Sequence, residues 1–225
     1  MTAFTDLANE IASCAACPRL VAWRTHAAEH APKRFVDSEY WARPVPGFGD
    51  PRARIVCVGL APGAHGANRT GRMFTGDRSG DFLFASLYRC GLANQPTSAS
   101  RTDGLKLVDA YVTSAVRCAP PDNAPAVDER DRCQSFLVRE LALLRRAQVF
   151  VALGGFAYAA LWRVLGTWLE LPKPRPRFGH GIEVVTDAGV ILGCFHPSQQ
   201  NTFTGRLTER MMDSVFLRAC ALRDE

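Results

Sequence analysis

A glycine-rich stretch over residues 59–77 is the feature that most restricts how this chain can fold. It follows the short apolar run 55–58 and precedes a second apolar segment that begins at Phe82. This order predicts a buried strand, a long loop and a helix, and α/β sheets place their binding sites at such connections. Glycines let the backbone approach a ligand closely. The loop is about three times as long as an ordinary strand-to-helix connection, which favours a functional role over that of a simple connector.

The same alternation of short apolar runs and amphipathic segments continues along the chain. Strands are expected near residues 54–59, 109–115, 148–153, 182–186 and 190–194. Helices are expected near residues 4–13, 80–92, 127–146, 155–165 and 207–222. This pattern indicates an α/β sheet with helices on both of its faces. A length of 225 residues fits one domain, so we interpret residues 1–225 as a single domain on which residues 1–53 pack as an N-terminal segment.

The net charge of +5 comes from 27 basic and 22 acidic residues, and only three of the basic residues are lysines. Arginine binds phosphate through two parallel hydrogen bonds and stacks on bases, so this bias suits a polyanionic partner. A biased genome composition would produce the same excess, and the sequence leaves both explanations open. No apolar run approaches the roughly 20 residues that a membrane span needs. The start of the chain lacks the pattern of a secretory signal, and we expect a cytoplasmic protein.

The eight cysteines fall into two groups, and a disulfide framework is not expected in a chain without an export signal. Four lie in apolar segments and are interpreted as small core residues: Cys57, Cys90, Cys194 and Cys220. Four lie in polar or proline-flanked settings: Cys14, Cys17, Cys118 and Cys133. Thiolates in such settings hold zinc or an iron–sulfur cluster, and the fourteen residues between Cys118 and Cys133 suit a cluster somewhat better than a tight zinc knuckle. Four unconnected free thiols are the alternative.

A second polar loop follows the strand expected at 190–194. It begins with Phe195, His196, Pro197 and Ser198 and continues through small or polar residues to Arg206. A single histidine after a strand is more often structural than functional. A His-Pro-Ser turn at the carboxyl end of a strand, followed by amides and an arginine, is more typical of a site. Residues 195–208 are therefore a second candidate site loop.

Together with the four cysteines, these two loops make the chain resemble the uracil-DNA glycosylase superfamily, and most of all family five, the type-b enzymes of bacteria and archaea. The resemblance extends over essentially the whole chain. It is carried by residues 14–20, 40–51, 59–77 and 116–121, by Asn123, Cys133 and His196, and by residues 200–202 and 204–208. No one of these motifs is decisive, whereas their order and joint presence are specific.

The resemblance implies a three-layer αβα sandwich around a central, mostly parallel four-stranded sheet. It also implies a structural [4Fe–4S] cluster on Cys14, Cys17, Cys118 and Cys133, which would tie the N-terminal segment 1–53 to the sheet. The implied activity is that of a DNA repair glycosylase, which flips a damaged base out of the duplex, hydrolyses its N-glycosidic bond and so starts base excision repair. Uracil is the expected substrate, with hypoxanthine, ethenocytosine and hydroxymethyluracil as further ones. The expected partner is DNA containing such bases, bound by a monomer.

Three residues then have expected roles at the base. Phe74 would stack on it, and the glycines beside Phe74 favour a loop position over a core one. Asn123 would read the uracil edge, because its amide both donates and accepts; a turn-forming asparagine after two prolines is the alternative. His196 would donate a hydrogen bond to uracil O2 as negative charge grows there, and a neutral imidazole suffices for this.

The residue that acts on water is less obvious. Other families of the superfamily have Asp or Asn two residues after the glycine that opens the first loop, whereas this chain has Ala61, a departure shared with family five. The remaining carboxylate of the loop is Asp77, which would position water or shield the cationic sugar. Its alternative role is to cap the following helix.

The other expected contacts surround these residues. The base pocket is expected to comprise Gly63, Ala64, His65, Phe74, Asn123 and His196. The DNA contacts are expected to comprise Asn68, Arg69, Arg72, Gln199, Gln200, Asn201 and Arg206. Arginines and loop amides would hold phosphates, while Gln200 and Asn201 would touch the orphaned base.

Two other classes of function remain as alternatives. A non-catalytic nucleic-acid-binding protein stabilised by a metal would fit the alanine at position 61. An electron-transfer protein would use a reducible cluster and would release no base. A nucleoside triphosphatase is disfavoured, because the chain has neither a P-loop nor a dinucleotide-binding glycine motif.

Overall fold

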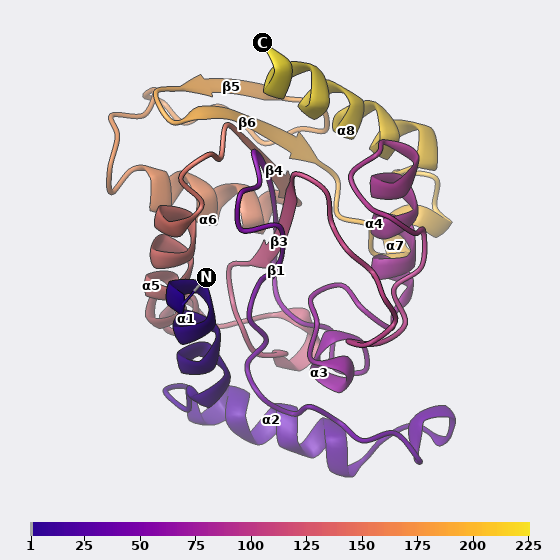
Figure 1. The fold of residues 1–225 in the computed structure, drawn as a ribbon. Helices are drawn as coiled ribbons and strands as arrows, with labels where there is room; N and C mark the ends of the chain where they lie inside the picture. Colours follow the sequence, from indigo (N-terminus) through magenta and orange to yellow (C-terminus); the bar gives the residue numbers. More distant parts are fainter. Residues whose placement is uncertain (1) are drawn as a thin grey trace.

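The computed structural model describes residues 2–225, and within them the chain forms one mixed six-stranded sheet with helices on both faces (Figure 1). The strands are β1 (Phe48–Gly49), β2 (Ile55–Gly59), β3 (Ala110–Ser114), β4 (Val149–Leu153), β5 (Glu183–Thr186) and β6 (Gly189–Cys194). Their order across the sheet is β1-β3-β2-β4-β6-β5. The four central strands are parallel, and β1 and β5 add antiparallel edges.

The helices form two outer layers. They are α1 (Thr2–Ser13), α2 (Pro18–Glu29), α3 (Ala67–Thr70), α4 (Arg78–Arg89), α5 (Val127–Leu143), α6 (Gly155–Leu165), α7 (Gln199–Phe203) and α8 (Glu209–Asp224), with single 3-10 turns η1 (Lys33–Phe35) and η2 (Pro121–Asn123). Figure 1 shows α1, α5 and α6 on one side of the sheet and α4 and α8 on the other. An α/β sandwich of three layers is thus confirmed.

Alternation along the central strands divides the core between these layers. Ile55 and Cys57 of β2 pack with the α4 and α8 side chains, whereas Val56 and Val58 pack with those of α5 and α6. All five residues of β2 are buried, as expected for a parallel strand that is covered on both faces. Such strands are nearly continuous apolar runs, which is why the sequence identified them.

The predicted four-stranded sheet is wrong in its number of strands. The two-residue strand β1 adds an edge beside β3, with Phe48 opposite Val112, and β5 pairs antiparallel with β6. A two-residue strand has no periodic signal in the sequence. The β5–β6 hairpin follows from the short turn that joins the two strands, since antiparallel neighbours need only a tight connection.

The N-terminal segment is ordered against the sheet. Leu7 and Ile11 of α1 pack on Phe136 of α5, and Pro18 begins α2 at the first helical position, which suits its fixed φ. Farther along, the amides of Trp41 and Val45 donate to the carbonyls of Arg69 and Arg117, at 2.9 and 2.8 Å. Residues 41–45 are therefore packed through backbone hydrogen bonds onto the two loops that follow β2 and β3.

Within residues 2–225, none of the helices combines the length and apolar character that crossing a bilayer requires.

Candidate active site

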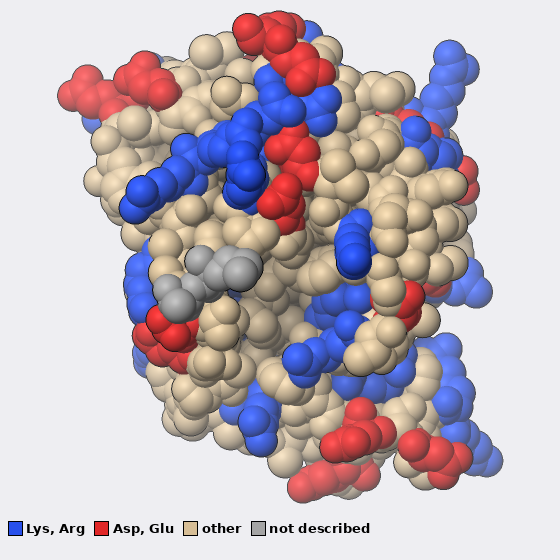
Figure 2. Space-filling view, viewed as in Figure 1, with Lys and Arg blue, Asp and Glu red and all other residues tan. Residues whose placement is uncertain are grey.

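Loops that follow three of the four parallel strands meet at the carboxyl edge of the sheet. The first loop, residues 60–77, follows β2; residues 115–126 follow β3; and the second loop, residues 195–208, follows β6. Parallel strands place all these connections at one edge, where open α/β sheets bind their ligands. Figure 2 shows Lys and Arg side chains beside the hollowed centre of this view, over α3 and the segment before β1.

Phe74 and His196 come together at this edge from two different loops. Their ring centroids lie 6.0 Å apart at an angle of 35°. Phe74 is largely buried and has a φ of 51°, which an aromatic residue rarely adopts. A Cβ at Gly59 would lie 2.7 Å from the Phe74 ring, so the glycine that ends β2 makes room for it. The backbone thus holds the ring in an unusual position beside the histidine.

Burial sets the protonation state of His196. Removal from solvent lowers the pKa of its imidazole to about 4, because the charged form loses its hydration. The ring is therefore neutral at physiological pH and carries one N–H donor. The Nδ2 of Asn201 donates to the His196 carbonyl at 2.8 Å and fixes the backbone of this turn.

Asp77 uses its two carboxylate oxygens differently. Its Oδ1 accepts a hydrogen bond from the Gly80 amide at 2.9 Å and caps α4. Its Oδ2 faces the start of the first loop, where a Cβ at Gly66 would overlap it and a Cβ at Gly63 would lie 2.9 Å away. Burial raises the pKa of this carboxyl, while the amides of Gly80 and Ser79 lower it. Asp77 therefore caps α4 with Oδ1, while Oδ2 faces the glycines at the start of the first loop.

Two residues predicted to contact DNA are instead buried. Asn68 is fully buried and its Nδ2 donates to the carbonyls of Arg24 and Ala64, at 3.1 and 3.2 Å. Arg72 is 5% exposed, and its guanidinium pairs with Asp103 at 2.7 Å. Both side chains are thus engaged within the protein instead of exposed to a ligand, because a long loop that is packed on the protein must satisfy its own buried polar groups.

Arg72 has further partners that explain its burial. Its Nε donates to the hydroxyl of Thr75 and its Nη2 to that of Ser98, each at 2.9 Å. Asp103 also accepts three backbone amides, from Ala99, Ser100 and Leu105. These bonds hold the pKa of Asp103 well below its usual range, and the first loop is thereby fastened to residues 98–105.

His65 and Arg69 lie at the outer side of the first loop and are half-buried. The Tyr40 hydroxyl is hydrogen-bonded to His65 Nδ1 at 2.9 Å, and burial lowers the pKa of His65. Arg69 donates to the carbonyls of His65 and Gly76, which joins the two ends of the loop, and its guanidinium lies 4.1 Å from the centre of the Phe35 ring. Tyr40 was missed as a site residue, although it lies within the motif 40–51.

The second loop carries its exposed side chains on the short helix α7. Gln199 and Gln200 are exposed, and Arg206 lies exposed over the Phe195 ring at 4.8 Å. Phe203 ends α7 with 67% of its surface exposed, and the Arg78 guanidinium lies 5.2 Å from its ring. Gln199, Gln200 and Arg206 therefore remain available to a ligand, whereas Asn201 is engaged with the His196 backbone.

Asn123 lies exposed in η2, at a φ of 55°. This left-handed conformation is one that asparagine tolerates well in turns. Its side-chain amide makes no hydrogen bond within the part of the chain that the structure describes, so its role at the base stays a prediction. Ala61 packs instead against Leu20, Val116 and Cys118, on the side of the loop that faces the cysteines.

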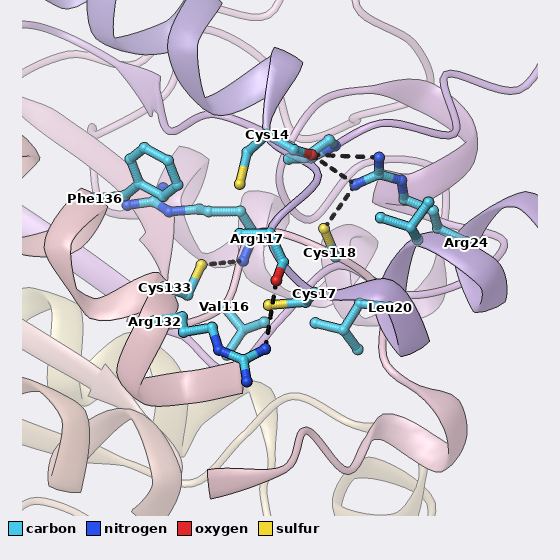
Figure 3. Close-up of a pocket in the computed structure, with 13 residues that line it drawn as sticks. Cys14, Cys17, Leu20, Arg24, Val116, Arg117, Cys118, Arg132, Cys133 and Phe136 are labelled. Carbon is cyan, nitrogen blue, oxygen red and sulfur yellow. Dashed lines mark hydrogen bonds between the residues drawn. The ribbon is translucent and has the colours of Figure 1, made fainter. Parts of the chain in front are cut away.

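The four cysteines that the sequence singled out line one pocket (Figure 3). Cys14 follows α1, Cys17 precedes α2, Cys118 lies in the loop after β3 and Cys133 lies on α5. All four are free thiols, and together with apolar and basic neighbours they line a small pocket. Among residues 2–225, no three His, Cys, Asp or Glu side chains form a group that would hold a single metal ion.

Two sulfur atoms of this pocket already accept hydrogen bonds. The Arg117 amide donates to Cys133 Sγ at 3.3 Å, and the Arg24 guanidinium donates to Cys118 Sγ at 3.0 Å. Burial raises the pKa of Cys118 to about 11 and that of Cys133 to about 12. These thiols are neutral on their own, and donors aimed at sulfur suit thiolates bound to a metal group. The donor set therefore fits a group with thiolate ligands.

Comparison with known proteins assigns the sequence to one family. The model of the uracil DNA glycosylase superfamily matches residues 46–219. This chain belongs to the uracil-DNA glycosylase superfamily. The matched region contains the first and second site loops together with Cys118 and Cys133. The predicted family is confirmed.

Similar curated proteins place the chain with the type-5 members. A type-5 uracil-DNA glycosylase from Mycobacterium leprae is 51% identical over 94% of this chain and 92% of its own length. One from Thermus thermophilus is 48% identical over 93% of each chain. A type-4 uracil-DNA glycosylase from Archaeoglobus fulgidus is 32% identical over 70% of this chain and 62% of its own length. The similarity to type-5 proteins thus covers nearly the whole chain.

Proposed function

We propose that this chain is a uracil-DNA glycosylase that hydrolyses the N-glycosidic bond of uracil in DNA and so starts base excision repair. The observation that carries the proposal is the meeting of Phe74 and His196, with ring centroids 6.0 Å apart, where the loops of β2 and β6 converge. The similarity to type-5 uracil-DNA glycosylases over nearly the full chain supports it.

Phe74 would provide the surface on which the flipped base stacks. Extrusion of a base from the duplex costs a few kcal/mol, and stacking on an aromatic ring returns about 1–3 kcal/mol. The left-handed backbone of Phe74 and its packing against Gly59 hold the ring before the base arrives. Little ordering cost therefore remains to be met on binding.

His196 would stabilise the leaving base. Breaking of the N-glycosidic bond leaves negative charge on the pyrimidine and positive charge on the sugar, as in glycoside hydrolysis generally. A partly buried, neutral imidazole offers an N–H donor that is already in place and partly removed from water, where such a hydrogen bond is strongest. Asn123 would add recognition of the uracil edge once a base occupies the pocket.

Asp77 would act on the water and the sugar. Its Oδ2 faces the backbone of Gly63 and Gly66, while Oδ1 is held by the Gly80 amide. A carboxylate fixed in this way would orient the attacking water and stabilise the cationic sugar. Ala61 does neither, since it has no polar side chain and packs toward the cysteines.

Exposed side chains around the two loops would hold the DNA. Gln199, Gln200 and Arg206 are free to contact the strand, and Arg69 would reach a phosphate with the part of its guanidinium that is not bonded to the loop. Contacts to phosphate position the duplex without reading its sequence. The small side chain at Ala64 would leave room in the pocket, so hypoxanthine, ethenocytosine and hydroxymethyluracil are proposed as additional substrates.

We propose further that Cys14, Cys17, Cys118 and Cys133 hold a [4Fe–4S] cluster that ties the N-terminal segment 1–53 to the sheet. Four thiols that line one pocket and the hydrogen bonds to two of their sulfur atoms suit a thiolate-bound group, and the resemblance to family five favours a cluster over a single zinc ion. When bound, the cluster would cross-link α1 and α2 to α5 and to the loop after β3. Iron and sulfide analysis of purified protein tests it; zinc in their place would reject it.

A base-release assay tests the proposed activity. Oligonucleotides with a single uracil, hypoxanthine or ethenocytosine, single-stranded or opposite different bases, are incubated with the protein and then treated with alkali. Strand scission at uracil is expected, and it should decrease strongly when His196 is replaced by Ala. Binding of the uracil-containing DNA without scission would favour a non-catalytic binding protein. Size-exclusion chromatography of the same sample tests the proposed monomer, and fractionation of the source cells its cytoplasmic location.

A further inference from the structure

Arg24 is a buried cation without an acidic partner. It lies on α2 with 8% of its surface exposed, and its Nε has no hydrogen-bond partner. Within residues 2–225, no aspartate or glutamate forms an ion pair with it, whereas the buried Arg72 and Arg117 pair with Asp103 and Glu140. A guanidinium stays protonated in proteins, so its buried charge needs compensation from elsewhere.

The cysteines supply the remaining contacts of this guanidinium. Nη1 donates to Cys118 Sγ at 3.0 Å, and Nη1 and Nη2 both donate to the Cys14 carbonyl at 3.4 Å. Figure 3 shows the guanidinium directed between these two cysteines from the side of the pocket opposite Phe136. Neutral thiols would leave the cation uncompensated. Four thiolates around a cluster carry net negative charge and would provide the missing counter-charge.

The backbone of the same residue contacts the first loop. The Arg24 carbonyl accepts the Nδ2 of Asn68 at 3.1 Å, and Asn68 donates the same group to the Ala64 carbonyl at 3.2 Å. Asn68 is fully buried, so the surrounding side chains restrict its rotamer. Its Oδ1 has no hydrogen-bond partner in the described chain, and its Nδ2 therefore makes all of its side-chain hydrogen bonds. The side chain of Arg24 thus touches the cysteines while its carbonyl anchors the loop that carries the glycines facing Asp77.

We propose that Arg24 is a positioning residue that joins the metal site to the base pocket. Its guanidinium balances the charge of the group on the four cysteines, and its carbonyl fixes Ala64 through Asn68. Occupancy of the cysteine site would in this way set the shape of the first loop. This inference rests on the proposed cluster, and the tests below separate the failure of one from the failure of the other.

The first test compares how firmly three variants hold iron. Arg24→Met removes the charge at similar volume, Arg24→Lys retains it, and Arg139→Met is the control. Arg139 is an exposed arginine of α5 that pairs with Glu10 and does not line the cysteine pocket. With an iron chelator, visible cluster absorbance should decay roughly tenfold or more faster in Arg24→Met, the scale of effect for residues that support metal ligands. Arg24→Lys should recover part of the loss, and Arg139→Met should decay like the unmodified protein.

Unmodified protein that contains iron, with Arg24→Met decaying at the same rate, would overturn the inference and leave the cluster assignment intact. Unmodified protein that contains no iron would overturn both. Should Arg24→Met fail to fold, comparison of the decay rates of Arg24→Lys and the unmodified protein still tests the role of Arg24. Cluster removal from the unmodified protein should increase amide hydrogen exchange in residues 64–70 at least as much as in α1, and unchanged exchange there would reject the link.

The second test separates the contact of Arg24 with the cysteines from its contact with Asn68 and the first loop. Asn68→Ala removes the bond to the loop but touches no cysteine, so iron content and decay rate should match the unmodified protein while uracil release slows. Arg24→Met should reduce both properties. If Asn68→Ala releases uracil at an unchanged kcat, the loop is not positioned through this residue and the proposed link is rejected.

Discussion

The carboxylate of Asp77 lies directly against the α-carbon of Gly66. A Cβ at this position would overlap Oδ2, so the first loop admits only glycine here without movement of the carboxylate. The two residues are eleven positions apart, at opposite ends of the loop that follows β2. Their contact means that the shape of the glycine-rich backbone and the direction of the only carboxylate in that loop are set together.

Replacement of Gly66 by Ala should lower uracil release much more than DNA binding, because the new methyl group would displace the Asp77 carboxylate. Overpacking of this kind also costs about 1–3 kcal/mol of stability. The matched control is Gly179→Ala, since a Cβ there meets nothing within 4 Å. Single-turnover base release and thermal unfolding of both variants check this. Full activity of Gly66→Ala would mean that the position of Asp77 is not critical.

The two roles of Asp77 are separable by substitution with Asn. Asparagine caps helices about as well as aspartate, so Asp77→Asn should unfold at nearly the same temperature as the unmodified protein. Asp77→Ala loses the bond to Gly80 and should be less stable by about 1 kcal/mol. If the carboxylate acts on water or the sugar, both variants release uracil slowly. An active Asp77→Asn would restrict Asp77 to capping.

The buried neutral state of His196 predicts how stability depends on pH. Its pKa is about 4 in the folded protein and 6.5 as an ordinary histidine, so the unfolded chain binds the proton first as pH falls. Stability from this residue is fully present above pH 6.5 and is lost as pH falls toward 4, by about 3 kcal/mol in total.

Urea unfolding of the unmodified protein and of His196→Gln between pH 4 and 7 measures this contribution. Burial also lowers the pKa of His65 and His180, and these residues act equally in both proteins. The difference between the two curves therefore isolates His196. The unmodified protein should lose more stability than the variant over this interval. Parallel curves would mean that the imidazole is not held neutral by burial.

The sequence predicted the central strands and the edge on which the site lies, because parallel strands that are buried on both faces are continuous apolar runs. It missed β1, α3 and α7, which are too short to show a period. The polar and proline-flanked settings of Cys14, Cys17, Cys118 and Cys133 set them apart in the sequence, and these residues line one pocket although they come from four separate elements. The choice of a cluster as their ligand rested on resemblance to a family, since spacing alone left zinc, a cluster and free thiols open.

The sequence predicted the roles of the polar residues in the first loop less well than it predicted the strands. Asn68 and Arg72 are as polar as any DNA-contacting side chain, and nothing near them in the sequence indicates burial. Arg72 is buried because Asp103, thirty-one residues later, folds back onto it. Arg24 and Asn68 likewise meet across forty-four residues. Partners so distant along the chain are fixed by tertiary packing, which local patterns do not contain.

Arg72 and Arg206 should therefore respond in opposite ways to substitution. Arg72→Met leaves the largely buried Asp103 without its cation and should lower the free energy of unfolding by about 3 kcal/mol, without altering how DNA affinity depends on salt. Arg206→Ala removes an exposed charge and should leave stability nearly unchanged, because only the contact with the Phe195 ring is lost. If Arg206 neutralises one phosphate, the slope of log affinity against log salt should fall by about one.

Titrations of uracil-containing DNA at several salt concentrations, with urea unfolding of the same samples, distinguish the effects of the two substitutions. A salt slope that changes in Arg72→Met but not in Arg206→Ala would reverse this assignment of the DNA-binding face.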